Sequence, residues 1–317
     1  MMLTPTDISK ILNVSSSHVS LLSKNFIISE DDVTKIGKRA YFNPRVTRKI
    51  LESRGVDFNK KESVAFGNNK GGTGKTSTAV NTALRLSAMG YNTLLIDADS
   101  QANATSHILG HSSEAARHTL IDVVSEKVDI KDAIITITDT LDILPSSLKN
   151  SMIDLELTSR SGRINSATYF KNLFEDLDYD YIIWDLSPTI TTSLYWILLS
   201  CTKIITVANL DEFAVQGTEM TVELINELKA NHKDFNPDIK ILINRFDERN
   251  KSLLHYLTRL NKLESKGATL FGSVIKTDST IQKTQSNQSM LPHNTQSFND
   301  LSDFIVEFCQ LDSLTKH

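Results

Sequence analysis

The sequence predicts an α/β protein with a mostly parallel, doubly wound sheet and a small, mainly helical domain ahead of it. From residue 63 onward, short apolar runs alternate with helix-like segments, which is the rhythm of strands joined by right-handed crossovers. A Gly-rich stretch joins the first of these strands to the first helix, and the residues ahead of it differ in charge from the rest. Strands are expected at residues 63–66, 93–96, 142–144, 181–184, 203–208, 240–243 and 270–275.

Composition places the chain among ordinary globular proteins. It has 317 residues, of which 40% are hydrophobic and 23% charged, enough for one large domain and one small one. No apolar run approaches the roughly 20 residues of a membrane span, and Asp7 and Lys10 interrupt any signal-peptide core. The two cysteines, Cys201 and Cys309, have no metal-binding or redox spacing, so we expect a reducing, cytoplasmic environment.

Charge divides the chain into two expected domains, residues 1–62 and residues 63–317. The first holds eleven Lys or Arg and seven Asp or Glu, a net charge of +4, in a chain whose total is −4. The remainder therefore carries −8. A basic module attached to an acidic body is typical of a protein that meets a polyanion. Polar residues 55–62 are expected to link the two domains.

The basic module begins with the pattern of a helix-turn-helix unit. Residues 6–12 predict a short helix capped by Thr6 or Asp7, and residues 17–24 predict a second helix after a tight turn. Val19, Leu21 and Leu22 are the expected core residues of the second helix. In a helix-turn-helix unit, this second helix enters the DNA major groove.

The rest of the module adds a hairpin. Residues 33–42 resemble a β-hairpin with a Gly-Lys-Arg tip, similar to the wing of a winged helix-turn-helix, and a further helix follows at residues 45–53. A helical dimerisation module, whose charges are merely solvated, is the alternative. Under the DNA-binding hypothesis, the expected contacts are Ser16, Ser17, His18, Lys24, Lys38 and Arg39.

A phosphate-binding loop is expected at residues 68–77, between the strand at 63–66 and the next helix. This stretch reads Asn-Asn-Lys-Gly-Gly-Thr-Gly-Lys-Thr-Ser, and its glycines let the backbone approach phosphate oxygens. Lys75 is expected to reach the β- and γ-phosphates, and the Thr76 hydroxyl to bind Mg²⁺. A Gly-rich turn carrying surface lysines is the alternative. The candidate nucleotide contacts here are Lys70, Gly71, Gly72, Thr73, Gly74, Lys75, Thr76 and Ser77.

Lys70, directly before the paired glycines, makes this loop resemble the deviant Walker A motif of the ParA/MinD ATPase family. The usual phosphate loop has glycine where this chain has Asn69. The resemblance covers about residues 63–310. It implies a P-loop NTPase fold, ATP as the nucleotide, and a homodimer in which Lys70 of one subunit reaches the nucleotide of the other. Lys70 and Lys75 are therefore candidate catalytic residues.

Two carboxylates follow the apolar run at residues 94–96. Asp97 and Asp99 lie two residues apart, so both face one side of an extended chain. Beside an Mg²⁺-nucleotide, one carboxylate can hold the water shell of the metal and the other can orient an attacking water. The run resembles the Asp-x-Asp-Pro-Gln segment of ParA proteins, with Ser100 in place of proline. This resemblance implies that Asp97 supports the metal and that Asp99 acts on the hydrolytic water; two acids capping a loop are the alternative.

A third acid ends the apolar run at residues 181–184. Asp185 has the Walker B position, in which the carboxylate bonds Mg²⁺-bound water. The ParA family usually continues with Asp-x-Pro-Pro, whereas this chain has Ser187 at the third position. The metal-site candidates are therefore Thr76, Asp97 and Asp185.

Asn244 follows the strand expected at residues 240–243. In related ATPases, an Asn at this strand end bonds the adenine edge; a turn-forming Asn after a strand is an equally good explanation. The family loop that would follow, at residues 274–292, lacks its Pro-Arg pair in this chain. Nonspecific DNA binding by the large domain therefore stays open.

The resemblance implies a cytoplasmic, nucleoid-associated partition ATPase. Such a protein dimerises on ATP, binds DNA, and hydrolyses ATP when a centromere-binding, ParB-like partner stimulates it, so that a plasmid or chromosome is segregated. The N-terminal module would bind and repress its own operator. The alternative is a nucleotide-responsive transcription repressor without a segregation role. The acidic final helix, expected at residues 298–311, argues against a membrane-bound, MinD-like role.

Overall fold

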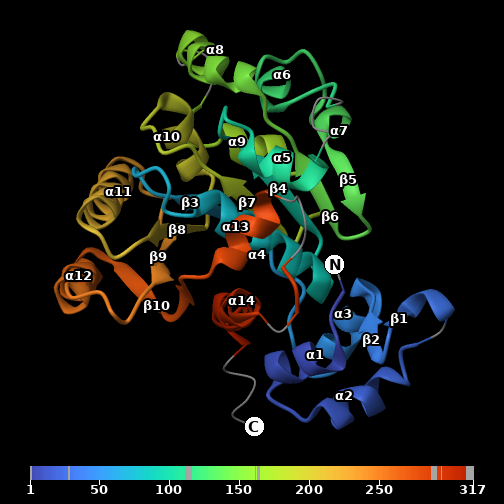
Figure 1. Ribbon diagram of the computed structural model, residues 1–317. Coiled ribbons are helices and arrows are strands. Elements are labelled where there is room, and N and C mark those ends of the chain that lie inside the picture. Colours follow the sequence, from blue (N-terminus) through green and yellow to red (C-terminus); the bar gives the residue numbers. More distant parts are fainter. Residues whose placement is uncertain are drawn as a thin grey trace.

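An eight-stranded sheet runs through the larger part of the chain, as the computed structural model in Figure 1 shows. The structure describes residues 2–311 except 28, 111–115, 161, 163–164, 287–290 and 294. All neighbouring strands are parallel except β5, which pairs antiparallel with β6 at one edge. The order across the sheet is β10 (Ala268–Lys276), β9 (Asp238–Phe246), β8 (Lys203–Ala208), β3 (Glu62–Gly67), β7 (Tyr181–Asp185), β4 (Thr93–Asp97), β6 (Leu141–Leu144) and β5 (Ile135–Thr138).

The predicted mostly parallel sheet is confirmed, and each expected strand is present. The strand that the sequence did not reveal is β5, a four-residue edge strand reading Ile-Thr-Ile-Thr. Its side chains are partly buried or, at Thr136, exposed, because β5 has one neighbouring strand, and it lacks the continuous apolar run of the central strands.

Helices cover both faces of the sheet and form two separate cores. In β3, Val64 and Phe66 point into one core and Ala65 into the other, as alternation along a strand requires. The first core contains α4 (Lys75–Met89) and α14 (Gln296–Phe308). The second contains residues of α6 (Leu120–Val124), α7 (Ile130–Ala133), α8 (Ile153–Arg160), α9 (Tyr169–Phe174), α10 (Thr192–Leu199), α11 (Glu212–Asn231) and α12 (Leu253–Asn261). Two short helices, α5 (Asn103–Leu109) and α13 (Ser279–Ser286), complete this part of the chain.

The final helix packs as a core element. In α14, Leu301, Phe304, Ile305 and Phe308 are buried at helical spacing, as expected. Among the residues that the structure describes, no helix combines the length and the apolarity that crossing a bilayer requires.

The N-terminal module contains the predicted elements in the predicted order. They are α1 (Pro5–Leu12), α2 (Ser16–Ser23), β1 (Val33–Ile36), β2 (Arg39–Phe42) and α3 (Pro44–Glu52). Two details of the prediction are wrong. The cap of α1 is Thr4, because its hydroxyl accepts from the Asp7 amide while the Asp7 carboxylate accepts from the Thr4 amide. Leu21 is 62% exposed, since α2 buries a narrow face at Val19.

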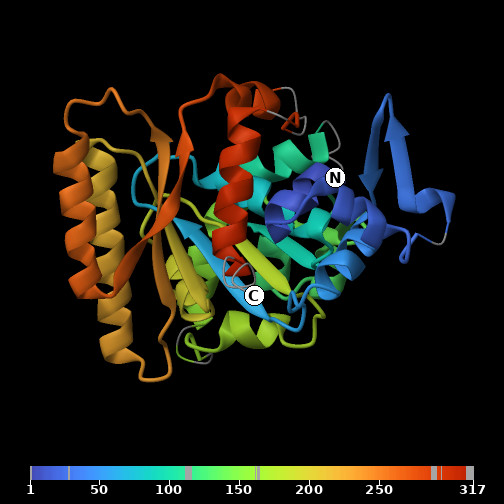
Figure 2. The same ribbon diagram turned by 90° about the horizontal axis from the view of Figure 1, so that it is seen from below.

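The N-terminal module packs tightly on α4 and α14 (Figures 1 and 2). Residues 55–62 were expected to be a polar linker, yet Phe58 is buried and its ring stacks on Tyr91 with centroids 4.2 Å apart. Arg48 of α3 donates from Nη1 to the carbonyl of Gly90, at the end of α4, over 3.1 Å. The module therefore shares one continuous hydrophobic core with the larger part of the chain.

Candidate active site

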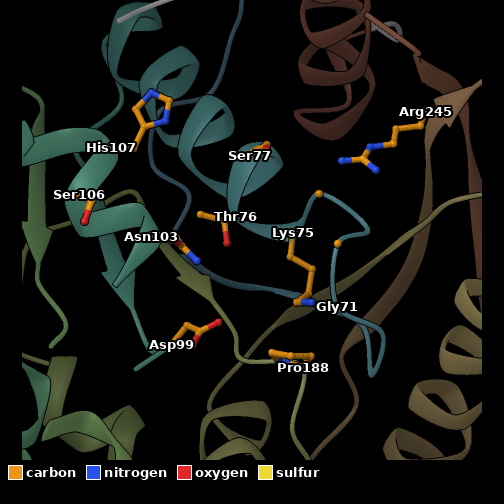
Figure 3. A pocket seen from close by; sticks show the side chains of 12 residues that line it. Gly71, Lys75, Thr76, Ser77, Asp99, Asn103, Ser106, His107, Pro188 and Arg245 are labelled. Carbon is orange, nitrogen blue, oxygen red and sulfur yellow. The ribbon is translucent and has the colours of Figure 1, made fainter. Parts of the chain in front are cut away.

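The predicted site residues meet at the carboxyl ends of the central strands, where ligands bind in open parallel sheets. Figure 3 shows Lys75, Thr76 and Asp99 directed toward one space. This space is a cavity of about 510 Å³. Its lining residues are Gly71, Gly72, Gly74, Lys75, Thr76, Ser77, Asp99, Asn103, Ser106, His107, Pro188 and Arg245.

The loop between β3 and α4 depends on glycine at position 74. Gly74 precedes α4 with φ +96°, a backbone conformation that residues other than glycine rarely adopt. A Cβ at this position would lie 2.1 Å from Nδ2 of Asn244. That amide in turn donates to the carbonyl of Thr73 over 2.7 Å, so Asn244 and the loop are packed without spare space.

Lys75 lies inside the loop. Its side chain is buried, and its ammonium donates to the carbonyl of Lys70 over 3.0 Å. Burial lowers the pKa of the ammonium, while the negative charges of Asp185 and Asp99 raise it. A buried ammonium facing two carboxylates at a helix N-terminus forms a cradle for a polyanion with its metal.

Lys70 lies on the outer side of the same loop. It is exposed, and its ammonium lies 5.6 Å from the centroid of the Phe213 ring. Among the described residues that line the 510 Å³ cavity, Lys70 is absent. The two lysines of the motif therefore have different surroundings: Lys75 lines the cavity, and the Lys70 ammonium lies beside Phe213.

Asp97 and Asp185 are register partners on the adjacent strands β4 and β7, and both are fully buried. Burial raises the pKa of each carboxyl, and the charge of the neighbouring acids raises it further. The oxygens of Asp97 are engaged: Oδ2 accepts from the amide and hydroxyl of Thr105, each at 2.8 Å, and Oδ1 accepts from the Asp99 amide. Asp97 thus holds the turn after β4 in place.

Asp185 is the acid that fits a metal best. Neither of its buried oxygens has a hydrogen-bond partner of good geometry among the described residues, although the Thr76 hydroxyl lies close enough to lower its pKa. An unpaired carboxylate next to a hydroxyl and a phosphate cradle is a donor set suited to a hard cation such as Mg²⁺. Asp97 and Asp185 therefore differ in their hydrogen-bond contacts, although sequence reasoning grouped them together as metal-site candidates.

Asp99 faces the cavity from the loop after β4. It is 8% exposed, and one of its oxygens, Oδ1, accepts from the Gln101 amide over 3.0 Å. The Ser146 hydroxyl donates to its main-chain carbonyl over 2.6 Å, which fixes the backbone. The carboxylate is thus held at the cavity wall, where a base that orients water has to be.

Asn244 lines a second cavity of about 250 Å³ next to the first. Because its Nδ2 is engaged by Thr73, the amide holds the phosphate loop, and adenine recognition by Asn244 stays a prediction. The lining residues of this second cavity are Gly74, Ser77, Thr78, Asn244, Arg245, Ile275, Lys276, Thr277, Asp278, Ser279, Ile281 and Leu301.

Sequence reasoning did not give roles to several cavity residues. Asn103, Ser106 and His107 come from α5, at the i, i+3 and i+4 positions that share one helix face. This spacing, directly after the Asp97–Asp99 motif, was the available signal. Arg245 lines both cavities and has φ +51°, an unusual conformation that no sequence pattern shows.

The candidate DNA contacts lie away from this cavity. Ser16, Ser17, His18 and Lys24 are exposed on or just after α2, and Lys38 and Arg39 are exposed at the tip of the β1–β2 hairpin. In Figure 2 this hairpin projects from the body of the molecule. The structure therefore places these residues on an accessible surface and brings none of them to the cavity.

Comparison with known proteins agrees with this geometry. The chromosome partitioning protein ParA of Caulobacter vibrioides is 29% identical over 202 residues, which is 62% of this chain and 73% of that protein. The sporulation initiation inhibitor protein Soj of Bacillus subtilis is 28% identical over 205 residues, 63% of this chain and 78% of that protein. The cell division protein PomZ of Myxococcus xanthus is 31% identical over 185 residues, and the match spans only 57% of either chain.

Solved structures share the fold. Apo McdA of Cyanothece superposes with a TM-score of 0.70 at 21% identity, over 79% of this chain and 99% of that one. The septum site-determining protein MinD of Pyrococcus horikoshii, complexed with Mg-ADP, has a TM-score of 0.63 at 21% identity, over 80% and 98%. A family model described as an AAA domain matches residues 61–241. Because this match spans more than half of the chain, the chain belongs to that AAA-domain family. It also resembles the ParA-type P-loop ATPases.

Proposed function

We propose that the protein is an Mg²⁺-dependent ATPase of the partition type, which uses ATP to switch between a free and a DNA-bound state. The observation that carries the proposal is the constellation around the phosphate loop. Lys75 and Thr76 line the cavity, and the fully buried carboxylate of Asp185 lies close enough to the Thr76 hydroxyl and the Lys75 ammonium for both to lower its pKa. Together they suit a triphosphate with its metal.

In ATP hydrolysis, the protein contributes mainly by positioning the reacting groups and by stabilising charge in the transition state. A bound Mg²⁺ would supply positive charge that offsets the negative charge developing on the phosphates. Lys75 would neutralise the β- and γ-phosphates, and Asp185 and Thr76 would hold the metal. Asp99 would orient the water that attacks the γ-phosphate, with Asp97 fixing the turn that carries Asp99.

The outward orientation of Lys70 supports a homodimer as the active form. Its ammonium lies on the surface rather than in its own cavity, so it is available to a nucleotide held by a second copy. Such a contact makes dimerisation depend on ATP, because each bound triphosphate becomes part of the interface.

A DNA partner and a protein partner complete the proposal. The N-terminal module, as a winged helix-turn-helix, would bind operator DNA through α2 and the basic hairpin tip. A centromere-binding, ParB-like protein would accelerate hydrolysis and so release the dimer from the nucleoid. The names of the relatives ParA and Soj, the first of which is a chromosome partitioning protein, favour this role.

A nucleotide-responsive repressor without a segregation role is the second candidate, and one contact favours it. Arg48 of α3 bonds the carbonyl of Gly90, at the end of the same helix that starts at the phosphate loop. A nucleotide-dependent shift of α4 would therefore act directly on the N-terminal module.

The deciding experiment measures oligomeric state and turnover on the full-length chain. With Mg²⁺ and a non-hydrolysable ATP analogue, sedimentation velocity should show a dimer, and with ADP a monomer. Lys75→Ala should abolish both dimerisation and ATP hydrolysis. A wild-type chain that stays monomeric at saturating analogue contradicts the partition proposal, whereas operator binding that responds to ADP and ATP without a dimer supports the repressor.

A further inference from the structure

The first two turns of α11 contact the loop that carries Lys70. The helix begins after Asp211, whose side chain caps it by accepting from the Ala214 amide over 2.9 Å. Sequence reasoning gave this helix no role beyond covering the sheet. Three of its residues nevertheless meet Lys70 or the residue that holds it: Phe213, Gly217 and Thr218.

Asn68 fixes the backbone of Lys70 to α11. Asn68 is 2% exposed, and its Nδ2 donates to the Thr218 hydroxyl and the Val207 carbonyl, each at 3.0 Å, with the Ala214 carbonyl at 3.3 Å. Its Oδ1 accepts from the main-chain amide of Lys70 over 2.9 Å. One buried amide therefore joins α11 and the carboxyl end of β8 to the residue before the paired glycines.

Gly217 makes this contact possible. A Cβ at position 217 would lie 2.5 Å from Oδ1 of Asn68 and 3.3 Å from the amide nitrogen of Lys70. The Asn68 side chain is not free to shift, because its amide nitrogen donates hydrogen bonds to the three acceptors just described. The close approach of α11 to the loop thus requires a glycine at this point.

Phe213 meets the other end of the lysine. Its ring is 68% exposed, so it contributes little to the core, and the Lys70 ammonium lies 5.6 Å from the ring centroid. A cation at this distance from an aromatic face is attracted by the ring quadrupole. Backbone and side chain of Lys70 are thus both held, from the inside by Asn68 and from the outside by Phe213.

We propose that the start of α11 positions Lys70 for a second copy of the chain, with Phe213 holding the ammonium and the Asn68–Gly217 contact holding the backbone. This inference rests on the proposed ATP-dependent dimer. A free lysine side chain loses rotamer freedom when it docks on a partner. Phe213 restricts those rotamers before the partner arrives, so less freedom is lost when the dimer closes.

The test compares variants that differ in the ring alone. Phe213→Leu keeps an apolar side chain but removes the π face, whereas Phe213→Trp keeps an aromatic face. With Mg²⁺ and a non-hydrolysable ATP analogue, Phe213→Leu should weaken the dimer roughly two- to fivefold, and Phe213→Trp should dimerise like the wild type. Leu254→Ala, which changes a leucine 78% exposed on α12, is the matched control and should leave the dimer unchanged.

A double-mutant cycle separates positioning from general damage. In a Lys70→Ala background, Phe213→Leu should have no further effect on the dimer, since the ammonium it holds is gone. Affinity of the monomer for a fluorescent ATP analogue should be the same in all the Phe213 variants. An equal loss in both backgrounds, or full dimerisation of Phe213→Leu, would overturn the inference while the dimer proposal stands; a monomeric wild type would remove both.

Discussion

The ammonium of Lys75 donates a hydrogen bond to the main-chain carbonyl of Lys70, over 3.0 Å. The inner lysine of the phosphate loop therefore holds the backbone of the outer lysine. Asn68 holds the amide of the same residue from the other side. The loop is thus preorganised by its own side chains, which is the condition for an anion site that needs little rearrangement on binding.

Substitution of each of the two lysines should have a different consequence. Lys75→Ala removes the buried charge in the cavity, so affinity for Mg²⁺-ATP should fall about 10- to 100-fold, as expected for a charged hydrogen bond. Lys70→Ala should bind nucleotide almost normally and dimerise much more weakly, with a dimer still measurable at high protein concentration, because Lys70 does not line the cavity. Fluorescent-nucleotide titration and sedimentation velocity measure the two effects; similar defects in both variants would contradict the division of roles.

Asp99 should be needed for hydrolysis and dispensable for assembly. Asp99→Ala removes the carboxylate at the cavity wall and should lower turnover about 100-fold or more, the usual effect of losing a general base. The ATP-bound dimer should persist and live longer. Phosphate-release assays at saturating ATP, paired with sedimentation, give the answer, and normal turnover in this variant would assign the water to another residue.

Asp185 should make the metal-free protein less stable as pH rises. Its pKa is raised well above the usual 3.8 by burial and by the charge of Asp97, so between pH 3.8 and the folded-state pKa the folded state binds more protons than the unfolded state. The free energy of unfolding therefore falls as pH rises through the folded-state pKa. Asp185→Asn should flatten this slope and raise the melting temperature in EDTA.

The same variant should lose the response to metal. Wild-type protein should gain melting temperature when Mg²⁺ and ADP are added, because the buried carboxylate gains a cation. In Asp185→Asn this gain should be small. A variant that melts lower than the wild type in EDTA and still responds fully to Mg²⁺ would place the metal elsewhere.

Gly90 should be essential for docking of the N-terminal module. Its φ is +96°, and a Cβ would lie 2.5 Å from Cβ of Arg48 and 2.7 Å from the carbonyl oxygen of Pro44. Gly267→Ala is the control, because Gly267 has φ +81° but no atom within 4 Å of such a Cβ. Gly267→Ala should cost about 1 kcal/mol of unfolding free energy from the backbone alone. Gly90→Ala should cost roughly 1–3 kcal/mol more than Gly267→Ala, from overpacking. If urea titration gives the same loss of unfolding free energy for both variants, α3 shifts to accommodate the added Cβ without cost.

The basic hairpin tip should govern the salt dependence of DNA binding. Lys38→Ala and Arg39→Ala remove exposed charges far from the cavity, so ATP turnover without DNA should stay unchanged. Operator affinity should fall, and the slope of log K against log salt should drop by about one for each DNA phosphate that the variant no longer neutralises. Lys251→Ala, on the large domain, is the control for surface charge. An unaltered slope in both hairpin variants would leave the dimerisation role of the module.

The predictable parts of the site each have a signal in their own stretch of sequence. The phosphate loop, Asp97, Asp99 and Asp185 each follow or end a buried apolar strand, and parallel strands bring their carboxyl ends to one edge. Those two facts sufficed to place the acids next to the loop. The difference between Asp97 and Asp185 was not predictable, because it depends on Thr105, which helix α5 brings to Asp97.

What remained hidden depends on interactions between distant segments. Phe213 is far from Lys70 in the sequence, and an exposed aromatic residue at a helix start has no local signature of its partner. Residues 55–62 looked like a linker by composition, yet Phe58 stacks on Tyr91. In both cases the deciding interaction is the contact of one side chain with an element that is distant in the sequence, and the local pattern gives no sign of that contact.

The stacking of Phe58 on Tyr91 bears on how the N-terminal module can be dissected genetically. A shortened chain that starts near β3 would leave Tyr91 and one flank of α4 facing water, because the module now covers them. Such a deletion mutant should lose solubility as well as the proposed operator binding, and its phenotype would not distinguish the two defects. Single substitutions on the hairpin keep the shared interior intact and so separate DNA recognition from folding.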